Sequence, residues 1–152
     1  EISRCSTLDR PHRASCCSSF WLQESQKNRM MHGVVNANWE AMISLVVGNE
    51  YRQTQLIDAV IDTGYTGFLS LPNEIIVALN LPWTGIDRGT LGDGSEVTFE
   101  VYAAKIIWDG EYRNIPVNEA EADPLIGMSL LHGFDLRIQA IEGGSVTINA
   151  LS

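Results

Sequence analysis

Apolar stretches separated by short glycine-containing turns dominate the chain from Asn38 onward. The stretch from Ala41 to Val47 is apolar and partly alternating, and Gly48-Asn49-Glu50 supplies a turn after it. Gln53 to Asp62 then returns as a second apolar stretch, so the pattern predicts two neighbouring strands joined by a hairpin.

The same pattern continues through the middle of the chain. Gly92-Asp93-Gly94-Ser95 predicts a tight hairpin between Arg88-Gly89-Thr90-Leu91 and a long strand from Glu96 to Trp108. Asp109-Gly110 is a typical two-residue hairpin turn, and it leads into a further strand from Glu111 to Val117.

Short strands and one or two short helices complete the pattern. Pro124-Leu125-Ile126-Gly127 is an apolar run that ends in glycine, and Asp135 to Ile141 and Ser145 to Ile148 read as the last strands. Asn73 to Leu79 and Met128 to His132 each predict a short helical segment. Many short strands with frequent turns indicate a mainly all-β barrel or sandwich.

Residues 1–29 differ from the rest of the chain. They are rich in Ser and Arg and have neither helical nor strand periodicity, and Met30-Met31 follow them directly. We expect a disordered or non-native extension over 1–29 and one domain over 30–152. A transit peptide is the weaker interpretation, because Glu1, Asp9 and Glu24 break the acid-poor pattern of such peptides.

Length and charge limit the class of protein. A chain of 152 residues with 45% hydrophobic residues has the size of one globular domain. No apolar stretch approaches the roughly 20 residues of a membrane helix, so we expect no membrane partner. The formal net charge of −9 argues against nucleic acid as a partner, because phosphate binding needs clustered Lys and Arg.

Cysteine usage bears on the compartment. The three cysteines, Cys5, Cys16 and Cys17, all lie in the first segment, so the body needs no disulfide. A reducing cytoplasm is therefore the expected location.

The residues that point to chemistry follow the second strand. The apolar stretch ends in Asp62-Thr63-Gly64, and Tyr65, Thr66 and Gly67 continue the loop before a second apolar segment begins. A lone Asp-Thr-Gly should arise by chance in roughly 3% of chains this long. Its context makes it more specific, because a second apolar segment ending in glycine, Leu125-Ile126-Gly127, comes about 60 residues later.

From about Asn38 to Ile148 the chain resembles a retropepsin-like aspartic protease, of the small prokaryotic type with one Asp-Thr-Gly per chain. The resemblance implies a single-domain closed barrel that forms a two-fold homodimer. It implies that Asp62 is the catalytic residue and that Leu125-Ile126-Gly127 threads through the loop beneath it. Gly92, Asp93 and Gly94 would form the flap that binds the substrate.

The resemblance also implies the reaction, which is hydrolysis of a peptide or protein substrate by an aspartic endopeptidase. Two carboxylates about 3 Å apart share one proton, so one activates a water while the other donates to the developing oxyanion. Gly64 permits close backbone approach, the Thr63 hydroxyl bonds across the two-fold axis, and Thr66 donates to the carboxylate of Asp62. The reaction needs no cofactor and no metal, and His12, His32 and His132 have no ligand spacing.

Alternative interpretations remain at this stage. Asp62 could be an ordinary turn aspartate, and the 92–95 hairpin could be a plain surface turn. A dimer that uses the same fold to bind extended peptides without cleaving them is the alternative function. Two residues depart from the family pattern: Tyr65 stands where a small residue is common, and Asp58 lies four residues before Asp62, on the same face of a regular strand.

Overall fold

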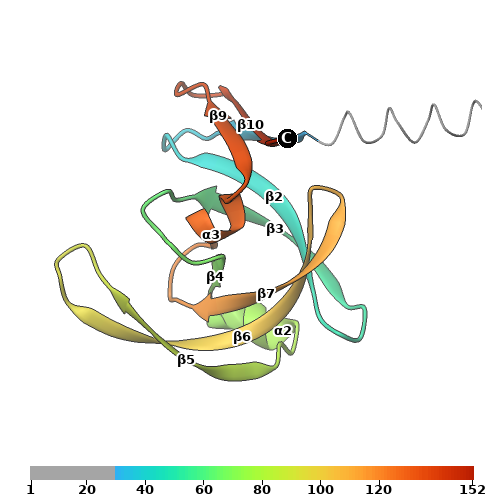
Figure 1. Cartoon of the computed structure of the whole chain (residues 1–152), viewed down its shortest axis with the longest axis vertical. Helices are drawn as coiled ribbons and strands as arrows, with labels where there is room; N and C mark the ends of the chain where they lie inside the picture. The colour runs from blue at the N-terminus through green and yellow to red at the C-terminus, as the bar shows by residue number, and fades with distance from the viewer. Residues whose placement is uncertain (1–29) are drawn as a thin grey trace, which may run out of the picture. The chain divides into compact units, whose positions relative to one another are not determined.

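The computed structural model describes residues 30–152, and residues 31–152 form one compact unit (Figure 1). The expectation for residues 1–29 concerns a segment outside the described part of the chain. The elements found in residues 31–152 are β1 (Met31–Val35), β2 (Ala41–Gly48), β3 (Thr54–Ile61), β4 (Leu69–Leu71), α2 (Asn73–Ala78), β5 (Trp83–Thr90), β6 (Glu96–Trp108), β7 (Glu111–Glu119), β8 (Leu125–Ile126), α3 (Met128–Leu131), β9 (Phe134–Ile138) and β10 (Ser145–Ala150).

All the strands belong to one sheet with the order β5-β6-β7-β4-β8-β3-β2-β1-β10-β9. An additional pairing joins β2 to β6, where Val47 lies opposite Ile106 and Gly48 opposite Lys105. This pairing brings β6, from one half of the strand order, next to β2, from the other half. The hydrophobic core lies between these two halves of the sheet. The mainly all-β class predicted from the pattern of short strands is confirmed.

The core is built by alternation along the strands. In β2 the side chains of Ile43, Leu45 and Val47 are buried, whereas Ser44 between them is exposed. Successive side chains of a strand point to opposite faces, so the apolar residues meet on one side. Trp108 at the end of β6 is 1% exposed and makes an edge-to-face contact with Phe134, with ring centroids 5.8 Å apart.

The short strand β8 lies between β3 and β4. It runs parallel to β3, with Ile61 opposite Ile126, and antiparallel to β4, with Leu69 also opposite Ile126. Ile126 is fully buried at this crossing. The segment 125–127 therefore passes through the loop that joins β3 to β4, as the resemblance implies.

All three predicted hairpins are present, because β2 pairs with β3, β5 with β6 and β6 with β7, each antiparallel. Asp109 and Gly110 adopt φ values of 53° and 76°, which suit the type I′ turns that favour Asp-Gly, and they join β6 to β7. The turn between β5 and β6 is closed by the amide of Leu91, which donates to the carbonyl oxygen of Ser95 at 2.8 Å. Figure 1 shows the β5–β6 hairpin projecting as a curved arm from this unit.

The structure differs from the sequence prediction by one additional strand and at the end of another. The strand β1 was not predicted, and β9 ends at Ile138 rather than Ile141. Gly33 interrupts the apolar pattern of β1, but a Cβ there would lie 1.9 Å from the carbonyl oxygen of Met42. The glycine is therefore required by close approach to β2. Among the described residues, no helix has the length and apolar character to cross a membrane.

Candidate active site

The candidate catalytic residue, Asp62, directly follows β3 and is fixed by its backbone on both sides. Its amide donates to the carbonyl oxygen of Ile126 at 2.9 Å, and its own carbonyl oxygen accepts from the amide of Tyr65 at 3.2 Å. The carboxylate oxygen Oδ1 accepts from the amide of Gly64 at 2.9 Å. The side chain is half-buried, so it is oriented by the loop while one part of it stays accessible.

The loop after Asp62 is held by the segment that threads through it. The amide of Gly127 donates to the carbonyl oxygen of Phe68 at 3.1 Å, and the amide of Met128 donates to that of Tyr65 at 2.8 Å. A Cβ at position 127 would lie 2.2 Å from the carbonyl oxygen of Gly67. Position 127 must therefore be glycine for the segment to pass at this distance.

The aromatic ring of Tyr65 fills the space beside two glycines. A Cβ at position 67 would lie 2.3 Å from the Tyr65 hydroxyl oxygen, and one at position 127 would lie 2.6 Å from the ring carbon Cδ2. The hydroxyl oxygen is buried and has no hydrogen-bond partner within residues 30–152. Burial and, to a lesser degree, the negative charge of Asp87 raise the pKa of Tyr65 to about 12.

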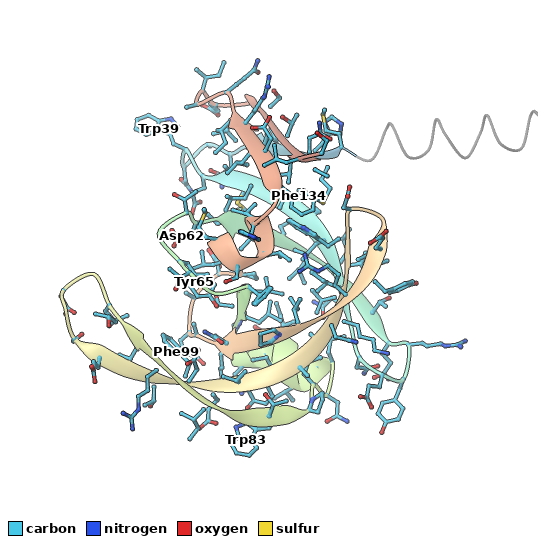
Figure 2. All side chains as sticks on the ribbon, viewed as in Figure 1. Trp39, Asp62, Tyr65, Trp83, Phe99 and Phe134 are labelled. Atoms are coloured by element: carbon cyan, nitrogen blue, oxygen red, sulfur yellow. The ribbon has the colours of Figure 1, made fainter. Side chains whose placement is uncertain are left out.

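A cleft of about 830 Å³ opens beside Asp62. The loop residues Asp62, Gly64 and Tyr65 line one side of it, and residues of β5 and β6 line the other. In Figure 2, Asp62 and Tyr65 lie above the β5–β6 arm, and Phe99 of β6 lies on the side of the arm that faces them. Volumes of this size are typical of ligand sites, so the cleft is the candidate substrate site.

The predicted flap residues occupy the turn between β5 and β6. Gly92 borders the cleft, whereas Asp93 and Gly94 are not among the residues that line it. Asp93 instead stabilises the turn, because its Oδ1 accepts from both the amide and the hydroxyl of Ser95, at 2.9 and 2.6 Å. These hydrogen bonds lower the pKa of Asp93.

Thr63, Thr66 and Asp58 are the other residues near Asp62 for which the sequence suggested a role. Thr63 and Thr66 are both exposed, and within residues 30–152 neither hydroxyl donates to Asp62. The expected bond from Thr66 to Asp62 is not formed: the Gly64 amide donates to Oδ1, and the Thr66 carbonyl oxygen accepts from the hydroxyl of Ser129. Asp58 accepts a hydrogen bond from the hydroxyl of Ser44 on β2 and does not line the cleft.

A second groove, of about 580 Å³, also borders Asp62. Most of its lining residues are apolar, and they include Val35 of β1, Val60 of β3 and Ile138 of β9. Trp39 stands at this groove with 83% of its surface exposed. Trp39 does not stand out in the sequence, because a tryptophan outside a predicted strand gives no indication of function until its exposure is known.

Solved structures with a similar fold were found by structural comparison. A retropepsin-like aspartic protease from Rickettsia conorii matches with a TM-score of 0.53 and 18% identity, covering 81% of this chain and 92% of that one. The fold is retropepsin-like. EIAV protease complexed with the inhibitor HBY-793 also matches, with a TM-score of 0.47 and 16% identity, covering 60% and 85% of the two chains.

Sequence comparisons add no closer relative. No protein-family model matches the chain, and no curated protein matches it either. Within residues 30–152 no group of three or more His, Cys, Asp or Glu side chains is arranged to hold a metal ion. The retropepsin-like fold and the cleft beside Asp62 are therefore the basis for a functional proposal.

Proposed function

We propose that the protein is an aspartic endopeptidase that acts as a homodimer, with Asp62 of each subunit in the catalytic pair. The observation that carries the proposal is the placement of Asp62. Its carboxylate stands at the edge of an 830 Å³ cleft, in a loop of the retropepsin-like fold, and is oriented by the Gly64 amide. The Rickettsia conorii protein of similar fold is an aspartic protease, which supports the same reaction class.

The chemistry requires two carboxylates. Two such groups at about 3 Å cannot both be ionised, so they hold one proton between them. The ionised member takes a proton from a bound water, which attacks the peptide carbonyl carbon, and the protonated member donates to the carbonyl oxygen. The two titrations belong to the pair rather than to either subunit.

A chain with one Asp62 needs a second copy to form this pair. The apolar groove at Trp39 supports such an assembly, because it borders Asp62 and leaves a large aromatic side chain exposed. A two-fold axis next to Asp62 would bring the two copies of the groove together in an isologous interface. The hydroxyl of Thr63, exposed and without an acceptor within residues 30–152, would be available to the partner.

The test is cleavage of a mixed peptide library between about pH 4 and 7, with wild type and the Asp62→Asn variant compared. Loss of cleavage with an unchanged dimer by analytical ultracentrifugation is the expected result. Cleavage that survives in Asp62→Asn would contradict the proposal, as would an active monomer. Peptide binding without cleavage in both proteins would instead indicate the non-catalytic binding module.

A further inference from the structure

Asp87 brings a second carboxylate to the cleft. It lies on β5 directly opposite Phe99 of β6, and side chains of residues paired across two strands lie on the same face of the sheet. Phe99 is on the face toward Tyr65 (Figure 2), so Asp87 is on that face too. Asp87 also lines the cleft and is exposed.

No cation neutralises Asp87 in the part of the chain that the structure describes. Its Oδ1 accepts only from the amide of Arg88, at 2.8 Å. Arg88 also borders the cleft, but it is paired with Thr98, on the opposite face of the two strands. The carboxylate therefore faces the cleft as an unpaired negative charge.

Two aromatic residues stand close to this charge. The ring of Phe99 lies against β5, because a Cβ at Gly89 would be 2.7 Å from its carbon Cε2, and Gly89 shares the face of Asp87. The hydroxyl of Tyr65 is buried and has no hydrogen-bond partner within residues 30–152. The charge of Asp87 is near enough to this hydroxyl to contribute to the raised pKa of Tyr65.

We propose that Asp87, Phe99 and Tyr65 form a subsite for a cationic side chain of the substrate, the ammonium of Lys or the guanidinium of Arg. The inference rests on the proposed function and specifies its substrate class. Asp87 supplies the opposite charge, Phe99 supplies a surface for the aliphatic stem and an aromatic face for the cation, and Tyr65 lines the same cleft beside them. An acidic side chain is disfavoured there by repulsion from Asp87.

The test measures binding and cleavage separately. The probe for binding is a randomised, end-capped octapeptide library offered to immobilised Asp62→Asn protein, with the retained peptides sequenced. We expect Lys and Arg to be enriched at one position by about threefold to tenfold, the range of a partly exposed charge pair with hydrogen bonds. Asp87→Asn in the same background should remove the enrichment, and Asp87→Lys should replace it with a preference for Asp and Glu.

The matched control is Glu96→Gln. Glu96 lies in the same hairpin and carries the same charge, but it does not line the cleft, so its removal should leave the enrichment unchanged. The cleavage arm uses the intact Asp62 protein and peptide pairs that differ only by Lys or Met at the selected position. The Lys peptide should be cleaved several-fold faster, and the advantage should shrink as salt is raised.

The outcomes separate the two proposals. Enrichment of basic residues without any cleavage would support the subsite and overturn the proposed endopeptidase. Cleavage with equal preference for Lys and Met would support the endopeptidase and overturn the subsite. Absence of enrichment in the library, or equal loss in Asp87→Asn and Glu96→Gln, would also overturn the subsite.

Discussion

The ring of Tyr65 occupies the space that a side chain at Gly67 would need, with its hydroxyl oxygen 2.3 Å from the position of a Cβ there. The two residues are therefore fitted to each other within one loop. This packing fixes the position of the Tyr65 ring in the loop that follows Asp62. It determines the shape of the cleft wall next to Asp62.

We predict that Gly67→Ala lowers the free energy of unfolding by about 1–3 kcal/mol, because the new methyl group must displace the ring of Tyr65. In a Tyr65→Ala background, the same substitution should cost less than about 0.5 kcal/mol. Urea denaturation of the four proteins of this double-mutant cycle measures the difference. If Gly67→Ala lowers the free energy of unfolding equally in both backgrounds, the Tyr65 ring and a side chain at position 67 do not compete for the same space.

Gly127→Ala should be more damaging, because its Cβ would meet the backbone carbonyl oxygen of Gly67 rather than a side chain that can rotate. We expect a loss of about 3 kcal/mol or a failure to fold. Gly92→Ala is the control, since a Cβ at position 92 has no heavy atom within 4 Å. If the two variants have the same midpoint in denaturant, the threading of 125–127 through the loop is wrong.

The Tyr65 hydroxyl gives a pH signature. Its pKa is about 12 against an ordinary value of 10.0, so the folded protein holds this proton more tightly than the unfolded chain. Its contribution to stability is intact below about pH 10 and is lost as pH rises from 10 toward 12. Denaturation midpoints should fall less steeply over this range in Tyr65→Phe than in wild type.

The pKa of Tyr65 can be measured by following the phenolate absorbance as pH is raised. Because Tyr102 also has a raised pKa, the signal of Tyr65 is taken as the difference between wild type and Tyr65→Phe. Asp87→Asn should bring the pKa of Tyr65 part of the way back toward 10, because burial, the larger cause, remains. No change in Asp87→Asn would show that the two side chains do not interact.

Asp58→Asn tests whether the neighbouring carboxylate takes part in catalysis. Asp58 is bonded to Ser44 and lies outside the cleft, so cleavage should stay within about twofold of wild type. The free energy of unfolding should fall by no more than about 0.5 kcal/mol, because the amide oxygen of the new side chain can still accept from Ser44, as a neutral rather than a charged acceptor. A loss of activity as large as that of Asp62→Asn would place Asp58 in the reaction.

Trp39→Ala tests the proposed interface. Removal of a large exposed aromatic side chain from the groove at Asp62 should weaken the dimer at least tenfold in sedimentation experiments. Cleavage at low protein concentration should fall in parallel and recover at high concentration. Trp83→Ala is the matched control, because Trp83 is 57% exposed but lies on the outer side of the β5–β6 arm (Figure 2). An unchanged dimer in Trp39→Ala would contradict this interface.

Local patterns predicted much of the fold. Asp109-Gly110 and the 92–95 segment predicted their hairpins, because a turn's backbone conformation depends on the residues within it. The apolar run Leu125-Ile126-Gly127 predicted a buried strand, because consecutive apolar side chains favour burial on both faces. The strand β1 was missed because Gly33 weakens its pattern, and the need for that glycine lies in Met42 of the next strand.

The site was predicted less completely than the fold. Asp62 stands out in the sequence, since an apolar strand leads into it and Gly64 follows. The proximity of Asp87 to Tyr65 across the cleft could not be predicted, because it depends on how the β5–β6 arm curves back toward the loop. The exposure of Trp39, where φ is 62°, likewise depends on the packing of distant strands.

The crossing of β8 between β3 and β4 has a consequence for how the protein is made. The loop that carries Asp62 cannot reach its final form until Ile126, more than sixty residues later, has been synthesised and has entered it. Contacts of such sequence separation form slowly, since a long segment must be ordered first. A nascent chain that has not yet reached Ile126 would therefore lack the completed loop that the proposed endopeptidase requires.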